Sequence, residues 1–384
     1  MGPAWLTDAV IADDLLELLG SRLPGDHARQ TRADELVGRA LAGRPGAAVL
    51  DLGCGAGDSV DLFRRLDPTG SWVGLDVEGS AEVAARTRRD AEFATFDGER
   101  VPYADGRFDL VYCVQVLEHV RRPGPLLCAA GPACLTDAVI ADDLLELLGS
   151  RLPGDHARQT RADELAGRAL AGRPGAAVLD LGCGAGDSVD LFRRLDPTGS
   201  WIGLDVEESV EVAARTRRDA EFVTFDGERV PYADGRFDLV YCVQVLEHVR
   251  RPGPLLAEAA RVLAPGGQLV GSTSQLEPFH SRSTANPTPY GLALDLGDVG
   301  LEVLQLRPGI DGLTLILRRG CGGARVFDRW WTRESPLHRA IDLYGHAARL
   351  DIPARNAAKL LFCGQFCFLA RKPDQLRPSP SGTG

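Results

Sequence analysis

An acidic residue followed by three alternating glycines occurs twice in this chain of 384 residues. In the second occurrence, Asp180 precedes Gly182, Gly184 and Gly186. Glycine accepts positive φ values and lets the backbone come close to a ligand. An apolar run precedes the loop and a helical pattern follows it, so the first amides of that helix can bind a polar group. These residues predict a site for a nucleotide-like ligand.

The charge of the loop separates two kinds of nucleotide ligand. A dinucleotide fingerprint has the spacing G-x-G-x-x-G and receives a pyrophosphate. Here the third glycine comes one residue early, Asp187 follows it, and Asp180 precedes the first glycine. Carboxylates at these places repel a pyrophosphate. The loop therefore favours a ligand with a cationic centre and counts against a nicotinamide-dependent reductase; a glycine turn without a ligand is the remaining interpretation.

The elements that position the loop alternate between strand and helix. Short apolar runs at 176–182, 200–206, 220–226 and 236–246 indicate strands, and the stretches between them have helical spacing. Amphipathic helices are expected before the first strand, at 138–152 and 157–170. This alternation predicts an α/β fold with a doubly wound sheet.

The front half of this pattern is present twice. Residues 2–127 align without gaps on residues 131–256, with six differences. After this repeat the second copy continues into a further helix and strand, whereas the first breaks off and restarts. We predict a truncated duplicate at 1–130, with helices at 9–23 and 28–41, and a complete domain at 131–372. Within the complete domain we expect a helical insertion near 328–348, and the Pro- and Ser-rich tail at 373–384 is expected to be disordered.

The second copy resembles the class I S-adenosylmethionine-dependent methyltransferases, and in particular their small-molecule branch called type 11. The segments "VLDLGCGAGDS", "WIGLDVE", "FDGERVPYADGRFDLVYCVQVLEHV" and "LLAEAARVLAPGGQLV" match the family motifs in order. The resemblance implies a Rossmann-like sheet of seven strands in the order 3-2-1-4-5-7-6. It also implies S-adenosylmethionine as cofactor and methyl transfer to a small-molecule acceptor at the second copy.

The resemblance assigns nine residues to the cofactor. Asp205 would bind both ribose hydroxyls, because a carboxylate suits a vicinal diol. Asp226 would bind the adenine amino group, although "FDG" is also a good turn sequence. Gln244 would lie near the methionine part or cap a helix. Asp180 would contact the ammonium group or orient the loop. The full set is Asp180, Gly182, Gly184, Gly186, Asp205, Val206, Asp226, Gly227 and Gln244.

The acceptor side is expected after strands four and five, where open α/β sheets bind ligands. Two histidines are catalytic candidates: His248, which has a structural role as its alternative, and His280, the preferred base for removing a proton from the acceptor. A long polar loop at 274–291 is expected to be functional. Trp330 either walls an apolar acceptor or packs the insertion against the sheet. The substrate candidates are Glu277, Asn286, Tyr290 and Trp330.

Composition limits partners and location. The net charge of −11 gives no basic surface for nucleic acid or an anionic membrane. The chain has no apolar run of membrane-spanning length, and acidic residues stand where a signal peptide needs positive charge. Nine cysteines without a CxxC pair predict reduced thiols and no metal site. We therefore expect a cytoplasmic protein with a small-molecule partner.

The first copy repeats the ligand-binding residues but lacks strand five and the acceptor loop. Its strand four would form an apolar edge. Three outcomes are open: a marginally stable half-domain, an element of a homodimer that pairs through this edge, or competition between the copies for one back half. One working site, in the second copy, is the favoured interpretation. A non-catalytic S-adenosylmethionine-binding or scaffold protein is the alternative for the whole chain.

Overall fold

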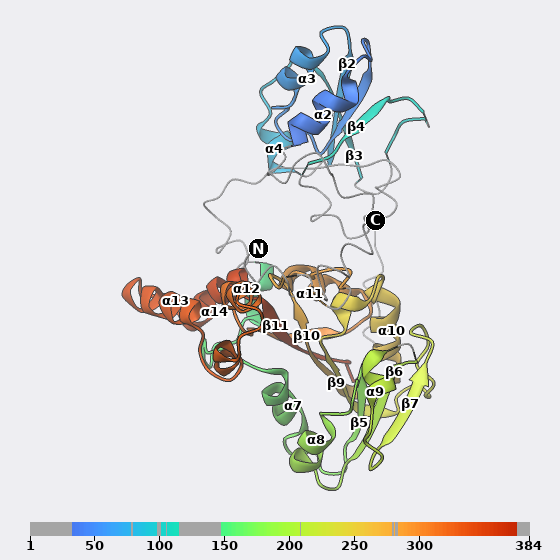
Figure 1. The fold of residues 1–384 in the computed structure, drawn as a ribbon, viewed down its shortest axis with the longest axis vertical. Coiled ribbons are helices and arrows are strands. Elements are labelled where there is room, and N and C mark those ends of the chain that lie inside the picture. Colours follow the sequence, from blue (N-terminus) through green and yellow to red (C-terminus); the bar gives the residue numbers. More distant parts are fainter. Residues whose placement is uncertain are drawn as a thin grey trace, which may run out of the picture. The chain divides into compact units, whose positions relative to one another are not determined.

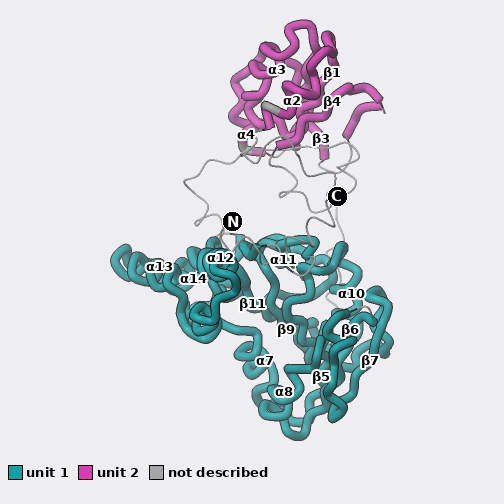
Figure 2. Tube along the Cα trace, in the orientation of Figure 1, with its two compact units in different colours: residues 1–23, 139–384 teal, residues 24–138 magenta. Residues whose placement is uncertain are grey.

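The computed structural model describes residues 33–77, 80–97, 101–104, 106–114, 147–207, 209–278, 280 and 283–374. These residues fall into two compact units, separated in Figure 2: described residues up to 114 form one, and those from 147 form the other. The helix expected at 9–23 and the tail from 375 onward lie outside the described residues.

The first unit has a four-stranded parallel sheet in the order β3-β2-β1-β4. Its strands are β1 (Ala48–Leu52), β2 (Ser71–Val77), β3 (Glu92–Phe96) and β4 (Leu110–Tyr112). Its helices are α2 (Ala33–Leu41), α3 (Val60–Leu66) and α4 (Ala81–Ala85). Among the described residues β4 has a partner on one side alone, as expected of a half-sheet.

The second unit contains a seven-stranded sheet in the order β10-β11-β9-β8-β5-β6-β7. The strands are β5 (Ala177–Leu181), β6 (Ser200–Val206), β7 (Glu221–Phe225), β8 (Phe237–Val243), β9 (Leu263–Ser274), β10 (Glu302–Pro308) and β11 (Gln365–Arg371). Strand β11 runs antiparallel to both neighbours, and the other pairings are parallel. Read from β7, this is the order 3-2-1-4-5-7-6, so the predicted fold is confirmed.

Helices cover both faces of this sheet (Figure 1). Successive strand residues point to opposite faces: Val178 packs in one core with α7 and α8, whereas Leu179 packs in the other with α10, α11 and α14. The helices and short 3-10 turns outside the insertion are η4 (Gly149–Arg151), α7 (Ala162–Leu170), α8 (Val189–Leu195), α9 (Val210–Ala214), η5 (Leu246–His248), α10 (Pro252–Val262) and α11 (Pro289–Asp298). Packing in these two cores fixes the strand ends that carry the glycine loop.

The helical insertion is larger than the sequence predicts. The prediction placed it at 328–348, whereas four elements lie between β10 and β11: α12 (Gly312–Gly320), η6 (Arg325–Trp331), α13 (Pro336–Ala347) and α14 (Ile352–Phe362). Asp311 and Asp351 cap α12 and α14 by accepting backbone N–H bonds at the third residue of each helix. These capping signals extend the insertion at both ends. Among the described residues, we find no helix whose length and hydropathy suit a membrane span.

The two copies differ in how well their cores close. Val240 on β8 is fully buried, whereas its counterpart Val111 on β4 is 40% exposed. Trp201 donates its indole N–H to Ser188, whereas the indole nitrogen of Trp72 is buried without a partner. A hollow of about 260 Å³ beside Trp72 is lined by residues of α2, β1, α3 and β2.

Candidate active site

The glycine loop after β5 is held in a conformation that a side chain would disrupt. Gly182 and Gly186 have φ values of 79° and 86°. A Cβ atom at Gly182 would lie 2.3 Å from Cγ2 of Val245, and one at Gly186 would lie 2.6 Å from Cζ of Phe222. Both glycines are therefore required for close packing of the loop against β7 and the segment after β8.

Asp180 lies beneath this loop rather than in an open cavity. It is 4% exposed, and the hydroxyl of Ser188 at the start of α8 donates a hydrogen bond to its carboxylate. The indole N–H of Trp201 donates to the same hydroxyl at 3.1 Å. Burial raises the pKa of Asp180 to about 7, the Ser188 hydrogen bond lowers it, and Asp205 raises it. Of its two expected roles, the geometry favours orientation of the loop.

Asp205 at the end of β6 receives the backbone of the loop. It is 8% exposed. The N–H of Gly184 donates to one carboxylate oxygen at 2.7 Å, and the N–H of Val206 donates to the other at 2.8 Å. A carboxylate has about four lone-pair sites, so each oxygen keeps one for a further donor.

Asp226 and Gly227 form a turn after β7. One oxygen of Asp226 accepts the backbone N–H groups of Glu228 and Arg229, each at 2.8 Å. These bonds lower the pKa of Asp226 below its usual value. A Cβ at Gly227 would lie 3.4 Å from Cγ1 of Val206, so the turn lies against the end of β6. The structure therefore contains the turn that the sequence offered as an alternative, and the contact of Asp226 with adenine stays a prediction.

Gln244 has a positive φ of 56°, which is uncommon for a residue other than glycine. Its backbone N–H donates to the carbonyl of Ser272 at 2.9 Å, and its side-chain NH₂ donates to the hydroxyl of Ser272 at 3.1 Å. Its side-chain oxygen accepts from Gln365 at 2.8 Å. Strained backbone held by several contacts occurs at functional sites. These hydrogen bonds fix Gln244 to Ser272 of β9 and to Gln365 of β11, and Gln244 does not cap a helix.

Glu277 joins the same network from the loop after β9. Its carboxylate accepts from the hydroxyl of Ser274 and from Gln365, each at 2.7 Å. Asn286 donates to the carbonyl of Glu277 at 3.2 Å. Two of the predicted acceptor residues are thus brought to the end of β9. Gln365 was missed by the sequence analysis because it belongs to the last strand, far along the chain.

Among the described residues, Tyr290 and Trp330 form no hydrogen bond with this network. Tyr290 lies in the first turn of α11 and is 37% exposed. The carbonyl of Trp330 accepts from Gln159 at 2.7 Å, and the guanidinium of Arg329 lies 4.5 Å from its ring centre. The backbone of Trp330 thus joins η6 to the segment before α7, and its ring lies against the guanidinium groups of Arg329 and Arg339.

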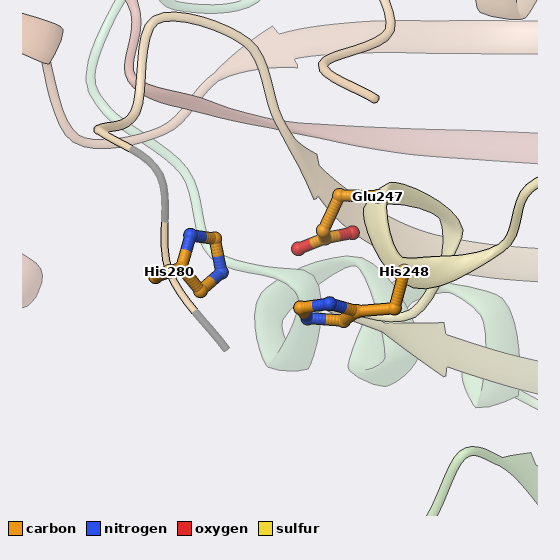
Figure 3. Close-up of side chains that lie close together, drawn as sticks. All are labelled: Glu247, His248 and His280. Carbon is orange, nitrogen blue, oxygen red and sulfur yellow. The ribbon is translucent and has the colours of Figure 1, made fainter. Parts of the chain in front are cut away.

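Two histidines and a glutamate converge beside Gln244. His248 ends η5, and its ring centre lies 5.3 Å from that of His280 at an interplanar angle of 82°. Glu247, which the sequence analysis did not select, is fully buried and accepts hydrogen bonds from the hydroxyls of Thr273 at 3.0 Å and Ser274 at 3.2 Å. Burial lowers the pKa of His248, although Glu247 opposes this effect. Figure 3 shows the three side chains pointing toward one another.

The glycine loop, Asp205 and the histidine pair thus lie at one edge of the sheet. This is the carboxyl edge of its parallel strands, where ligands of open α/β sheets bind. A separate hollow of about 320 Å³, lined by Arg173, Asp238 and Asp374 among others, lies at the amino ends of β5 and β8. It is remote from the residues that carry chemistry.

Comparison with known proteins agrees with this geometry. Two family models, both described as methyltransferase domains, match residues 179–271 and 26–139. The chain belongs to the class I S-adenosylmethionine-dependent methyltransferases. The cofactor of this family is S-adenosylmethionine, as the motifs of the sequence imply. The first match is within the second copy of this chain, and the second match is mainly in the first copy.

Its relatives match part of its length. An uncharacterized 37.1 kDa protein in transposon TN4556 of Streptomyces fradiae is 42% identical over 107 residues, or 27% of this chain and 31% of that protein. The ubiquinone biosynthesis O-methyltransferase of Pseudomonas aeruginosa (strain LESB58) is 30% identical over 175 residues, or 44% of this chain and 66% of the relative. The chain thus spans less than two thirds of these relatives. A solved SAM-dependent methyltransferase from Aquifex aeolicus is 16% identical, with a TM-score of 0.34, over 62% of this chain and 100% of that one.

Proposed function

We propose that this protein transfers the methyl group of S-adenosylmethionine to a small-molecule acceptor at the second copy. The observation that carries the proposal is the meeting of the glycine loop, Asp205 and the Glu247–His248–His280 cluster at one edge of the complete sheet. The names of relatives that act in ubiquinone biosynthesis support a small organic acceptor. The cofactor supplies a methyl group already activated by a positive sulfur.

The protein's own groups would hold the cofactor by shape and hydrogen bonding. The second lone pair on each Asp205 oxygen suits the two ribose hydroxyls, with Val206 beside them. Asp226 and Gly227 would border the adenine, and Gln244 the methionine part. Asp180 would act indirectly, by holding Ser188 and so the start of α8. The glycine loop contacts buried carboxylates and has no lysine or arginine in its sequence. It therefore fits a cationic ligand better than a pyrophosphate.

On the acceptor side, positioning supplies most of the rate, because in-line displacement needs the acceptor atom aligned with the methyl group. His248 and His280 are the catalytic candidates, since both lie where the acceptor's reacting atom would approach. Glu277 and Asn286 shape the neighbouring loop, and Tyr290 borders it at the start of α11.

A second function is favoured for the first copy alone. Gly55 donates its N–H to Asp76 at 2.7 Å, as Gly184 does to Asp205, and Ser59 donates to Asp51. The first copy therefore keeps the loop geometry without the acceptor side. Binding of S-adenosylmethionine without catalysis is the scaffold alternative for this copy.

The test compares matched variants of the full chain, Asp205→Ala and Asp76→Ala. We expect Asp205→Ala to abolish methyl transfer to acceptors in a metabolite extract and to remove the catalytic copy's S-adenosylmethionine binding in calorimetry. Asp76→Ala should leave transfer intact, because the first copy has no acceptor side. Transfer that survives Asp205→Ala but is lost in Asp76→Ala would reverse the assignment.

A further inference from the structure

Glu247, His248 and His280 each offer one ligand atom, and these atoms all lie within 4.8 Å of one another. Two of the residues come from η5, and the third from the loop after β9 (Figure 3). Two imidazoles and one carboxylate are a donor set that suits divalent first-row transition ions. Metal–nitrogen and metal–oxygen bonds of about 2.0–2.2 Å would draw the three groups slightly closer together.

The charge of the cluster also calls for a cation. Glu247 is fully buried, yet among the described residues no lysine or arginine pairs with it. Its side-chain partners there are the neutral hydroxyls of Thr273 and Ser274. The ring nitrogen Nδ1 of His248 is likewise buried without a hydrogen-bond partner. A buried carboxylate without a cation is costly, and a metal ion would satisfy both groups.

The surroundings of Glu247 resemble the outer shell of a metal ligand. Ligating carboxylates are themselves usually held by hydrogen bonds that fix their orientation. Here the hydroxyl of Thr273 donates to one oxygen, and the hydroxyl of Ser274, which is shared with Glu277, lies 3.2 Å from the other. The backbone carbonyl of Glu247 accepts the N–H of Thr284 at 2.7 Å, which ties the loop carrying His280 to η5. The loop and the 3-10 turn are thus joined at the point where their side chains converge.

The cluster lies beside the proposed methyl donor. The hydroxyl of Ser274 lies 3.4 Å from the side-chain oxygen of Gln244 and 3.2 Å from the carboxylate of Glu247, and Val245 packs against Gly182 of the glycine loop. Three protein ligands leave coordination positions open, as in catalytic metal sites. Those positions are near where an acceptor must approach.

We propose that Glu247, His248 and His280 bind one divalent transition-metal ion, whose open positions take oxygen atoms of the methyl acceptor. This inference rests on the proposed function, and it defines the acceptor class as one with a hydroxyl oxygen. The ion lowers the pKa of that hydroxyl, and its proton leaves to solvent. As the oxygen–methyl bond forms, the sulfur–methyl bond breaks and its electron pair stays on the sulfur, which becomes neutral. The histidines then act as ligands rather than as free bases.

The test uses the full chain, freed of metal by chelation and titrated with Co²⁺ under reducing conditions. We expect one bound ion with the ligand-field absorption of nitrogen and oxygen ligands and without sulfur-to-cobalt charge transfer. His280→Ala and Glu247→Gln should weaken binding by at least about tenfold, and Thr273→Val by about 10–100-fold, because each removes a ligand or its support. Zn²⁺ should displace the Co²⁺.

The duplication supplies a matched control. The first copy carries Glu118 and His119 at the positions of Glu247 and His248, but its sequence breaks off before any equivalent of His280. His119→Ala should therefore keep the wild-type Co²⁺ affinity, whereas His248→Ala should lose it. Equal affinity in these two variants, sulfur charge transfer, or no Co²⁺ binding by the wild type would overturn the metal site.

Calorimetry with S-adenosylmethionine on the same metal-free protein separates this inference from the proposed function. If the cofactor binds and Co²⁺ does not, the metal site is wrong and the proposed function stands. If the wild type does not bind the cofactor, the proposed function is wrong. Circular dichroism of each variant checks that a loss of Co²⁺ binding is not a loss of fold, and Glu247→Gln, which keeps the shape and one acceptor oxygen, is the decisive variant.

Discussion

Two buried aspartates, Asp51 and Asp180, occupy the same place beneath the glycine loops of the two copies. They are 3% and 4% exposed, and each accepts a hydrogen bond from the serine that precedes the next helix. Burial raises the pKa of each to about 7, against the effect of that serine. Because burial disfavours the charged form, ionisation of such a carboxyl group lowers the free energy of unfolding.

The pH dependence of stability should report this cost at Asp180. Its folded pKa of about 7 lies above the unfolded value of 3.8, so between these values the folded state binds more protons and stability falls as pH rises. Asparagine does not titrate. From about pH 4 to about pH 8, Asp180→Asn should therefore gain up to about 4 kcal/mol of unfolding free energy relative to wild type, at 1.4 kcal/mol per pKa unit.

Urea denaturation of the ligand-free protein at several pH values measures this difference. Asp187→Asn is the control, because that loop residue is exposed and should leave the pH profile unchanged. A constant difference between Asp180→Asn and wild type across the range would contradict the raised pKa.

At the scale of elements, the helical insertion is anchored by one buried lysine. Lys359 on α14 is fully buried and donates to the carbonyl of Ala157 at 2.6 Å, to Asp342 on α13 at 2.8 Å and to Glu334. Glu334 also accepts the N–H of Gln159. One ammonium group thus connects two helices of the insertion to the segment before α7.

Replacing Lys359 with methionine should destabilise the protein by about 3–5 kcal/mol, because it leaves Glu334 and Asp342 without their buried cation. The control is Arg318→Ala, which removes an exposed pair with Asp328 and should cost less than about 1 kcal/mol. Thermal unfolding of both variants measures the comparison. Similar melting temperatures for the two would show that the lysine does not hold the insertion.

At the scale of the whole molecule, the duplication produced two sheets of unequal completeness. The second copy buries Val240 on β8 completely, whereas Val111 on β4 remains 40% exposed. Both sequences are almost the same, so the difference comes from β9, β11 and their helices, which follow the second copy alone. Chain connectivity gives the second copy first access to them, because it closes the shorter loop.

A fragment of residues 131–384 should therefore transfer methyl groups at a rate comparable to the full chain, and residues 1–130 should not transfer them at all. Radiolabelled methyl transfer to a metabolite extract measures both fragments side by side. An active fragment 1–130, or a fragment 131–384 that regains activity only when 1–130 is added, would show that the first copy takes part in the catalytic domain.

Much of the fold was predictable because short stretches of sequence indicate its strands and helices. Apolar runs such as that around Leu179 and Leu181 mark the strands, and the motifs fix their order. The glycine loop and Asp205 were predictable for the same reason, since a strand, a turn and a helix follow each other directly. The insertion was predicted too short, because the caps Asp311 and Asp351 begin helices outside the stretch whose apolar periodicity was apparent.

The sequence by itself determined the fold, the family and the glycine loop, because these depend on residues close together in the chain. Tertiary structure alone decided that Glu247 and His248 meet His280, that Gln244 is fixed by Gln365, and that the backbone carbonyl of Trp330 bonds to Gln159 before α7. These contacts join segments that are distant along the chain. No local spacing can encode such contacts, because the sheet order sets which strand ends lie together.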